Sequence, residues 1–243
     1  DRMGDTFVVA DKRQDRVAEL KDRYGVDTAT NTEAAREADV VVLVVKPQDI
    51  FTVVEEIAAD LKPTALVVSL AAGVTTASLE ALLPDGMPVV RVMPNTPALV
   101  DEGMSAVSPG AHCTSDHVAL AVRLMACVGK VVEVPEKMQD AVTAISGSGP
   151  AYIFYTVEAM IEAGVGLGLP RRLATELTLQ TVYGAATMLR ETGEHPVVLR
   201  ENVTSPAGTT AAALRVLEDH KVRAAFLSAL EAARNRSIEL AGG

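Results

Sequence analysis

The sequence has no apolar stretch that is long enough to cross a membrane. Its apolar runs, such as residues 40–45 and 65–70, are far shorter than the roughly 18 residues that a membrane span requires. It also has no run of Lys or Arg that would form a basic stripe, and its formal net charge is −10. These absences argue against a membrane protein, and against nucleic acid or an anionic membrane as a partner.

Cysteine is scarce, and no targeting segment is visible. Cys113 and Cys127 form no CxxC motif, so we expect two buried, reduced thiols and a cytoplasmic location. His112, Cys113, Asp116 and His117 lie close together in the chain, but their spacing suits no standard zinc pattern. We therefore expect no metal site, and a surface loop that enters a helix at this point.

Strand and helix patterns alternate through the first half of the 243 residues. Apolar segments typical of buried strands occur at residues 7–10, 40–45, 65–70 and 89–93, with helical spacing at 49–61 and 75–83 between them. Two more strand-like pieces, 104–108 and 130–134, flank a helical pattern at 115–128. This alternation predicts a Rossmann-like, doubly wound, mostly parallel α/β sheet over residues 1–135.

The strand pattern ends at about residue 135. The helical segments 150–167 and 170–189 carry apolar or small residues around most of their circumference, and helices of that kind are packed on most sides. Residues 136–243 are too few to cover them, so we expect an all-α dimerisation domain that packs against another subunit.

The dinucleotide-binding fingerprint GxGxxG does not follow any apolar strand. Asp11, Lys12 and Arg13, however, follow the strand at 7–10 at the place where such folds bind the adenosine ribose. We therefore interpret 7–10 as a second strand, and expect the first strand, the glycine loop and the first helix upstream of Asp1. Asp11 favours NAD, whereas Lys12 and Arg13 favour the additional phosphate of NADP.

Small residues and proline follow three of the predicted strands. They are Lys46-Pro47, Ala71-Ala72-Gly73 and the segment 94–97. Each could be an ordinary turn, but ligands of doubly wound sheets bind beyond the carboxyl ends of the strands, and small residues there let a ring or phosphate approach the backbone.

Residues 202–210, with the sequence NVTSPAGTT, form a small-residue loop that opens a helix. Pro206 and Gly208 interrupt regular structure, and Thr209 or Thr210 is predicted to be the N-cap. The unpaired amides and the positive dipole end of such a helix can hold a small carboxylate. The alternative is an ordinary capped turn.

Six segments in order resemble the pyrroline-5-carboxylate reductase family: VKPQ (45–48), SLAAGV (69–74), MPNTP (93–97), DAVT (140–143), SGSGPAY (146–152) and NVTSPAGTT (202–210). The resemblance extends from about residue 7 to 240. It implies a Rossmann domain followed by a helical domain that intertwines with a partner, in a homodimer or a larger ring of dimers. The implied activity is reduction of L-1-pyrroline-5-carboxylate to L-proline by NAD(P)H, the last step of proline biosynthesis.

The resemblance also implies roles for individual residues. The cofactor residues would be Lys12 and Arg13 at the ribose or its 2′-phosphate, Asn31 at the adenosine half, Val44, Val45, Lys46, Pro47, Leu70, Ala71 and Ala72 along its path, and Asn95 and Thr96 near the nicotinamide. The substrate residues would be Ser205, Gly208, Thr209 and Thr210, with Asn202 and Val203 supporting the loop. We expect NADP(H) rather than NAD(H).

Reduction of a cyclic imine requires a hydride at carbon and a proton at nitrogen, so positioning would do most of the work. Thr210 is the predicted catalytic residue. Its hydroxyl is too weak an acid to act alone, so it would orient the imine nitrogen or relay a proton from water.

Two alternatives remain open. A related imine or β-hydroxyacid oxidoreductase would normally need a lysine on the long helix after the domain junction, and residues 139–190 contain none. A non-catalytic helical oligomerisation module with a decayed nucleotide fold would also explain the missing glycine loop.

Overall fold

The computed structural model describes residues 6–241, which form two compact units. One unit comprises the residues up to 147 together with those from 233 onward, and the other comprises residues 148–232. Each unit is described by itself below.

The first unit alternates strands and helices, as the sequence pattern predicts. Its elements are β1 (Val8–Val9), α1 (Gln14–Tyr24), β2 (Asp27–Thr28), α2 (Asn31–Glu37), β3 (Val40–Leu43), α3 (Pro47–Ile57), η1 (Ala58–Asp60), β4 (Leu66–Ser69), α4 (Thr76–Glu80), β5 (Val89–Met93), η2 (Thr96–Val100), β6 (Gly103–Pro109), α5 (Ser115–Ala126), β7 (Gly129–Glu133), η3 (Glu136–Met138), α6 (Gln139–Val142) and η4 (Thr143–Gly147). The elements β2 and α2, which sequence reasoning did not separate from the surrounding loops, lie between α1 and β3.

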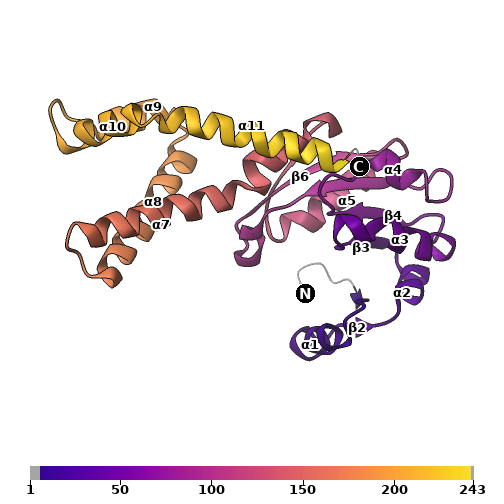
Figure 1. Ribbon diagram of the computed structural model, residues 1–243. Helices are drawn as coiled ribbons and strands as arrows, with labels where there is room; N and C mark the ends of the chain where they lie inside the picture. The colour runs from indigo at the N-terminus through magenta and orange to yellow at the C-terminus, as the bar shows by residue number, and fades with distance from the viewer. Residues whose placement is uncertain (1–5, 242–243) are drawn as a thin grey trace. The chain divides into compact units, whose positions relative to one another are not determined.

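The main sheet has five strands in the order β3-β4-β5-β6-β7. Strands β3, β4 and β5 are parallel, β6 runs antiparallel to β5, and β7 is parallel to β6. Strands β1 and β2 pair in parallel as a separate two-stranded sheet. Figure 1 shows this pair with α1 next to the main sheet, connected to it through α2. The predicted mostly parallel α/β sheet is confirmed.

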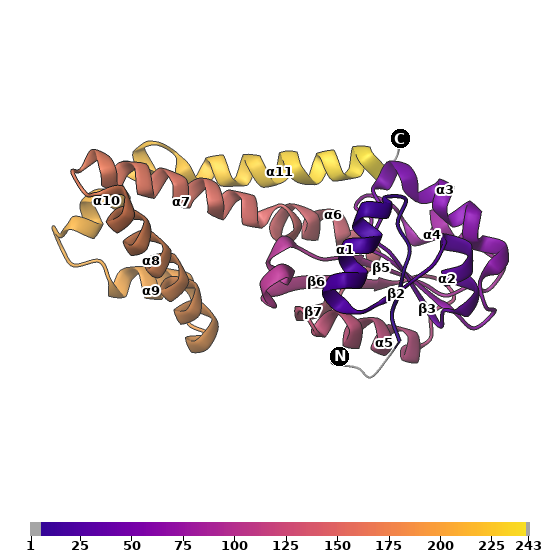
Figure 2. The ribbon, with the colours of Figure 1, turned by 90° about the horizontal axis from the view of Figure 1, so that it is seen from below.

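Helices cover both faces of the main sheet (Figure 2). On one face Val67 and Val89 pack with α3 and α4 through buried residues such as Ile50 and Leu79. On the other face Val68 and its neighbouring strands pack against α5. Successive residues of a strand point to opposite faces, so the β-branched run in β4 fills two cores.

Polar side chains define several helix starts in this unit. Thr30 and Glu33 form a capping box at α2, and the hydrogen bond from the Thr30 backbone N–H lowers the pKa of Glu33. Thr114 and His117 form the corresponding box at α5. The His112–His117 segment is therefore a loop entering a helix, as predicted. Pro47 begins α3, where its missing N–H costs no hydrogen bond.

The second unit is helical. It contains α7 (Gly149–Gly166), α8 (Arg171–Thr192), α9 (Pro196–Asn202), α10 (Thr209–Asp219) and the first part of α11 (Val222–Ala241). Pro150 lies in the first turn of α7, as the sequence predicts. Helices α7 and α8 pack on each other, and a bidentate ion pair joins Arg171 to Glu162 across the turn between them.

The structure bears on the expectations about membrane spans and about the two cysteines. In residues 6–241, no helix combines the length and apolarity that a membrane crossing requires. Within residues 6–241 Cys113 and Cys127 form no disulfide, and each thiol donates to a backbone carbonyl, that of Val89 and that of Arg123 respectively. Both are only partly buried, so the expectation of two buried thiols is wrong. Partial burial still raises the pKa of the Cys113 thiol through desolvation.

Candidate active site

The carboxyl ends of three neighbouring parallel strands bring most of the predicted cofactor residues to one edge of the main sheet. Val44, Val45, Lys46 and Pro47 follow β3, Leu70, Ala71 and Ala72 follow β4, and Asn95 and Thr96 follow β5. Val44 is 74% exposed, and Lys46 caps α3 without a side-chain bond. The edge thus carries exposed residues after β3 and small residues after β4, whereas the Asn95 side chain after β5 is hydrogen-bonded to the protein. Small residues at such an edge suit a flat ring or a phosphate.

Lys12 and Arg13 follow β1 and are already paired with carboxylates. The Lys12 ammonium lies 3.2 Å from the Asp49 carboxylate in the first turn of α3. The Arg13 guanidinium donates to both oxygens of Asp15, which lowers the pKa of that carboxyl. All four side chains are substantially exposed, so an anionic ligand could displace either carboxylate at low cost.

Asp11 shapes the same loop. One of its carboxylate oxygens accepts a hydrogen bond from the Arg13 backbone N–H at 2.8 Å, the pattern of an Asx turn. Part of the carboxylate that would favour a free ribose hydroxyl is thus engaged in the turn.

Asn31 is the first residue of α2, and its amide donates to Glu56 on α3 at 2.8 Å. The predicted adenosine contact therefore joins two helices. Among the predicted cofactor residues, Asn31, Lys12 and Arg13 all have acidic neighbours that a ligand would have to replace.

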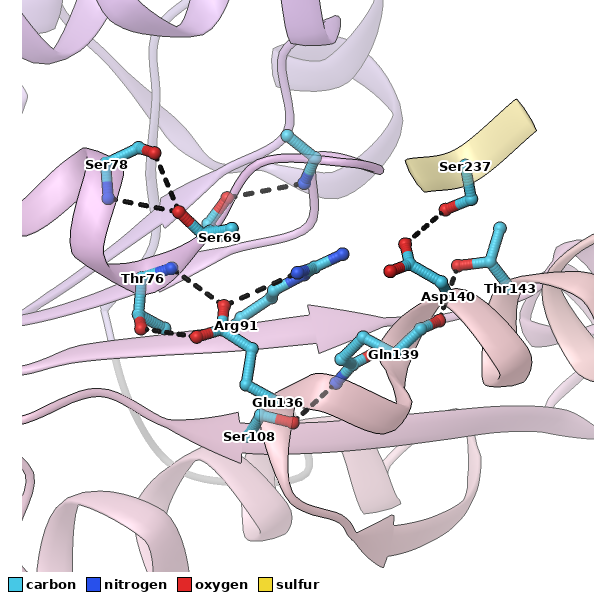
Figure 3. A network of polar contacts seen from close by, with 12 residues as sticks. Ser69, Thr76, Ser78, Arg91, Ser108, Glu136, Gln139, Asp140, Thr143 and Ser237 are labelled. Atoms are coloured by element: carbon cyan, nitrogen blue, oxygen red, sulfur yellow. Dashed lines mark hydrogen bonds and ion pairs between the residues drawn. The ribbon is translucent and has the colours of Figure 1, made fainter. Parts of the chain in front are cut away.

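Sequence reasoning missed a buried ionic network below this edge. Arg91 lies in the centre of β5 with its side chain 4% exposed, and its Nη1 is 3.4 Å from Glu136. Glu136 also accepts from the backbone N–H and the hydroxyl of Thr76, both at 2.8 Å. Figure 3 shows Glu136 between Thr76 and Arg91. A single arginine within the apolar run 89–93 was the signal that could have indicated such a pair.

A second polar group joins α6 to its surroundings (Figure 3). Gln139 is fully buried and donates to the Ser108 hydroxyl at 2.8 Å and to the Ala106 carbonyl at 3.2 Å. Asp140 accepts from the Ser237 hydroxyl on α11 at 2.7 Å. These bonds attach α6 to β6 and the C-terminal part of α11 to α6.

The predicted substrate residues lie together in the loop between α9 and α10. Asn202 ends α9, Val203 is its C-cap, and Ser205 begins the turn into α10. The Gly208 N–H donates to the Ser205 carbonyl at 3.0 Å, and Ala207 has a left-handed φ of 57°. This tight turn orients the chain into the helix.

The N-cap of α10 is Gly208, so the prediction that Thr209 or Thr210 caps the helix is wrong. The turn brings the chain into helical geometry one residue earlier, and Thr209 and Thr210 are the first two helical residues. A Cβ at Gly208 would overlap the Ser205 hydroxyl. Glycine therefore fits here, and it brings no side chain that could cap the helix.

The first turn of α10 consequently has free hydrogen-bond donors. Within residues 6–241 no group accepts from the backbone N–H of Thr209, Thr210 or Ala211, and the first turn contains no acidic residue. The first protein bond is from the Ala212 N–H to the Gly208 carbonyl at 3.1 Å. Free amides at the positive end of a helix dipole bind anions, a carboxylate among them.

Comparison with known proteins identifies the family. Residues 136–240 match the pyrroline-5-carboxylate reductase dimerisation family, and residues 2–73 match the coenzyme F420-dependent NADP oxidoreductase family. A pyrroline-5-carboxylate reductase from Corynebacterium melassecola is 50% identical over 236 residues, which cover 96% of this chain and 87% of the relative. The chain belongs to the pyrroline-5-carboxylate reductase family.

Solved structures of the reductase family agree with the fold. The enzyme from Coxiella burnetii is 44% identical with a TM-score of 0.89, covering 96% of this chain and 87% of that chain. The enzyme from Plasmodium falciparum, solved with NADP bound, is 31% identical with a TM-score of 0.86, covering 97% of this chain and 87% of that chain.

Proposed function

We propose that this chain is an NAD(P)H-dependent reductase that converts L-1-pyrroline-5-carboxylate to L-proline, the last step of proline biosynthesis. The observation that carries the proposal is the uncapped start of α10, where the amides of three successive residues have no acceptor among residues 6–241 and two of these residues, Thr209 and Thr210, carry hydroxyls. A small amino-acid carboxylate matches this set of donors in size and charge. The pyrroline-5-carboxylate reductases that this chain resembles support the choice of substrate.

The roles of the loop residues follow from their positions. The amides of Thr209, Thr210 and Ala211 would bind the substrate carboxylate, and Ser205 and Gly208 would shape the turn that presents them. Asn202 and Val203 at the end of α9 would support this turn from the other side. The half-buried Thr210 hydroxyl would donate to the imine nitrogen and so hold the C=N bond in a fixed direction.

The reaction adds a hydride to the imine carbon and a proton to the nitrogen. When bound, the dihydronicotinamide supplies the hydride. The proton comes from water, and the Thr210 hydroxyl can relay it because a hydroxyl both donates and accepts a hydrogen bond. No charged side chain is needed as an acid at this position, since a protonated imine accepts hydride readily.

Residues 1–135 would bind the cofactor, and residues 136–243 would bind substrate and form the dimer; the boundary after residue 135 remains a prediction. Small residues follow β4 and β5 at the place proposed for the cofactor: Ala71 and Ala72 come after β4, and Thr96 begins η2 after β5. Lys46 and Pro47 would lie against it at the start of α3.

NADP(H) is the proposed preference over NAD(H). Two cations, Lys12 and Arg13, lie in the loop after β1, while Asp11 is partly engaged by the Arg13 backbone. This arrangement supports recognition of the 2′-phosphate. Comparison of kcat/KM for NADPH and NADH measures the preference directly.

We further propose that the protein is a cytoplasmic homodimer, which could assemble into a larger ring of dimers. Large apolar side chains of α7 and α8 remain exposed in the single chain, including Phe154, Tyr155, Leu177 and Tyr183. Residues 136–240 match a dimerisation family. A second copy is the natural cover for this surface.

The direct test is oxidation of NADPH by pyrroline-5-carboxylate, followed by absorbance, with proline identified as the product. We expect turnover that requires the carboxylate, so that 1-pyrroline without it reacts much more slowly. Absence of proline would favour the non-catalytic alternative. Equal rates with 1-pyrroline would argue against the role of the α10 amides.

A further inference from the structure

Asn95, at the carboxyl end of β5, is bonded on both sides of its side-chain amide. Its Oδ1 accepts a hydrogen bond from the Met104 backbone N–H at 2.8 Å, where β6 begins. Its Nδ2 donates to the Ser146 carbonyl at 3.1 Å, within η4. One side chain thus connects three segments: the β5–η2 loop, the start of β6 and the segment that precedes α7.

These two bonds fix which way the amide faces. A flipped amide would place its NH₂ against the Met104 N–H and its oxygen against the Ser146 carbonyl, and both bonds would be lost. Asn95 is also the N-cap of η2, yet its side chain makes no cap bond there. The side chain is used for the connection between elements rather than for its own helix.

The partner segment η4 needs such a connection. It is a π-helical turn, in which the backbone bonding of an ordinary helix is shifted. Hydroxyl groups complete it from inside, from Thr143 to the Gln139 carbonyl at 2.8 Å and from Ser146 to the Val142 carbonyl at 3.2 Å. Asn95 provides the bond from outside. Gly147 lies so close to the terminal methyl group of Met93 that a Cβ there would require the methionine to move.

We propose that Asn95 is a positioning residue that holds the loop after β5 and the η4 turn together, rather than a residue that binds the cofactor. The inference rests on the proposed function, because this loop is the part of the sheet edge assigned to the nicotinamide. A loop held at both ends would hold in place the residues assigned to the nicotinamide, and a displacement of about 1 Å can cost about 100-fold in rate. In the proposed site, the residues after β1 and β3 would supply most of the contacts that set cofactor affinity.

The decisive variant is Asn95→Asp, because its effect depends on pH. A protonated carboxyl can donate to the Ser146 carbonyl and accept from the Met104 N–H, as the amide does. The ionised form still accepts from Met104 but faces the Ser146 carbonyl with a negative charge. We expect kcat at least about tenfold below wild type at pH 8 and a rising ratio to wild type as the pH falls toward 5.

Nearby charges are the same in both proteins. Asp101 and Glu102 on the turn between η2 and β6 are exposed and are present in wild type as well. Any effect of their titration on kcat therefore cancels when kcat of the variant is divided by kcat of wild type at the same pH. Asn235→Asp adds the same charge to the exposed side of α11 and is the matched control, with kcat expected within about twofold of wild type.

Asn95→Ala removes both bonds at every pH. We expect a loss of kcat with a ratio to wild type that does not change with pH, and a Kd for NADPH within about threefold of wild type. A Kd raised tenfold or more with kcat preserved would show direct cofactor binding and overturn the proposal. A ratio for Asn95→Asp that stays constant from pH 5 to 8 would overturn it as well.

Thermal unfolding separates this inference from the proposed function. The Tm of Asn95→Asp should approach that of wild type as the pH falls, because the protonated carboxyl restores the bond to Ser146. If wild type produces no proline while this Tm shift appears, the activity assignment fails and the connection through Asn95 stands. A pH-independent Tm difference would refute the connection itself.

Discussion

The two units of the chain bury their side chains to different extents. In the first unit, both faces of the sheet are covered by helices of the same chain. The polar side chains of Arg91 and Gln139 are buried there with hydrogen bonds, although Arg91 Nη2 and Gln139 Oε1 have no partner among the described residues. In residues 148–232, all of which the structure describes, Ala174 and Thr178 are the only buried residues. The apolar helices of this unit thus lack a core of their own.

The contrast indicates where stability comes from in each part. A sheet with helices on both faces gains its free energy of folding within one chain. In the proposed dimer, helices with large exposed apolar side chains would gain theirs by association, and their stability would depend on protein concentration. In this unit the first amides of α10 also have no acceptor among residues 6–241.

The largest effect should come from breaking the buried ion pair of the first unit. Glu136→Ala leaves the Arg91 guanidinium buried without its carboxylate and also removes the bonds to Thr76. We expect the free energy of unfolding to fall by about 3 kcal/mol, as measured by denaturant unfolding. The loss should not depend on protein concentration, because the network lies within one chain.

Two further variants test whether the uncompensated charge of Arg91 causes the loss of stability in Glu136→Ala. Glu133→Ala removes an exposed carboxylate three residues earlier, and its effect should stay within about 0.5 kcal/mol. Arg91→Met combined with Glu136→Ala removes both charges, so it should be more stable than Glu136→Ala alone. A double variant as unstable as the sum of the single ones would contradict an uncompensated Arg91 as the cause.

In the second unit, a charge placed on the exposed apolar surface should weaken the proposed dimer. Tyr183 is 66% exposed on α8, and Leu179 lies one turn before it with 52% exposure. We expect Tyr183→Lys to weaken dimerisation roughly 100-fold, because a charge would be buried against the second copy. Analytical ultracentrifugation over a range of concentrations measures this change.

Tyr24→Lys is the matched control in the first unit. Tyr24 is 60% exposed at the end of α1, so the same substitution is made at similar exposure. Dimerisation should be unchanged there. If both variants dissociated equally, or neither did, the contrast between the units would fail.

Thr210→Ala tests whether the open start of α10 acts in catalysis. We expect turnover to fall about tenfold to 100-fold with unchanged affinity for NADPH, because the hydroxyl is proposed to contact the imine nitrogen and not the cofactor. Steady-state kinetics with a separate measurement of NADPH binding shows the two effects. Thr210→Ser keeps the hydroxyl and should retain turnover within about threefold.

A control in the same loop guards against a general structural effect. The Thr204 hydroxyl donates to the Arg200 carbonyl at 2.6 Å, and Thr204→Ala therefore changes the loop without changing the proposed site. Its turnover should stay within about threefold of wild type. Normal turnover in Thr210→Ala would remove Thr210 from the mechanism.

Much of the first unit could be predicted because its patterns are local. The β-branched runs of β3 and β4 alternate with helical spacing, and these patterns predicted the parallel sheet and the edge to which Lys46, Ala71 and Asn95 are brought. Features that depend on contacts between distant residues were missed. Glu136 lies 45 residues from Arg91 in the chain, and Ser146 lies 51 residues from Asn95.

The start of α10 shows the same limit on a smaller scale. The loop and the helix were predicted, but the N-cap was placed on a threonine. The left-handed Ala207 and the Ser205–Gly208 turn decide the first helical residue, and a left-handed alanine is not indicated by its residue type.

The smallest effect concerns the loop after β1, where the charged side chains of the first unit form exposed ion pairs. Asp15 accepts from Nε and Nη2, two of the three nitrogens of the Arg13 side chain that would face the 2′-phosphate. That hydrogen bond lowers the pKa of Asp15, so the carboxylate stays ionised in an assay at neutral pH. It would be protonated, and would let go of Arg13, only at a pH below the usual pKa of an aspartate. Substitution is the practical way to remove it. We expect Asp15→Asn to lower KM for NADPH about two- to fivefold, with KM for NADH unchanged.

The adjacent pair provides the control. Glu19 binds Arg16 one turn further along α1 at similar exposure, and Glu19→Gln should leave both KM values within about twofold. The gain in Asp15→Asn should shrink in about 0.5 M salt, because exposed charges are then screened over a few ångströms. An equal gain for NADH would mean that Arg13 does not face the phosphate. In that case the loosely paired cations of the first unit would serve solubility, and the preference for NADP(H) would need another source.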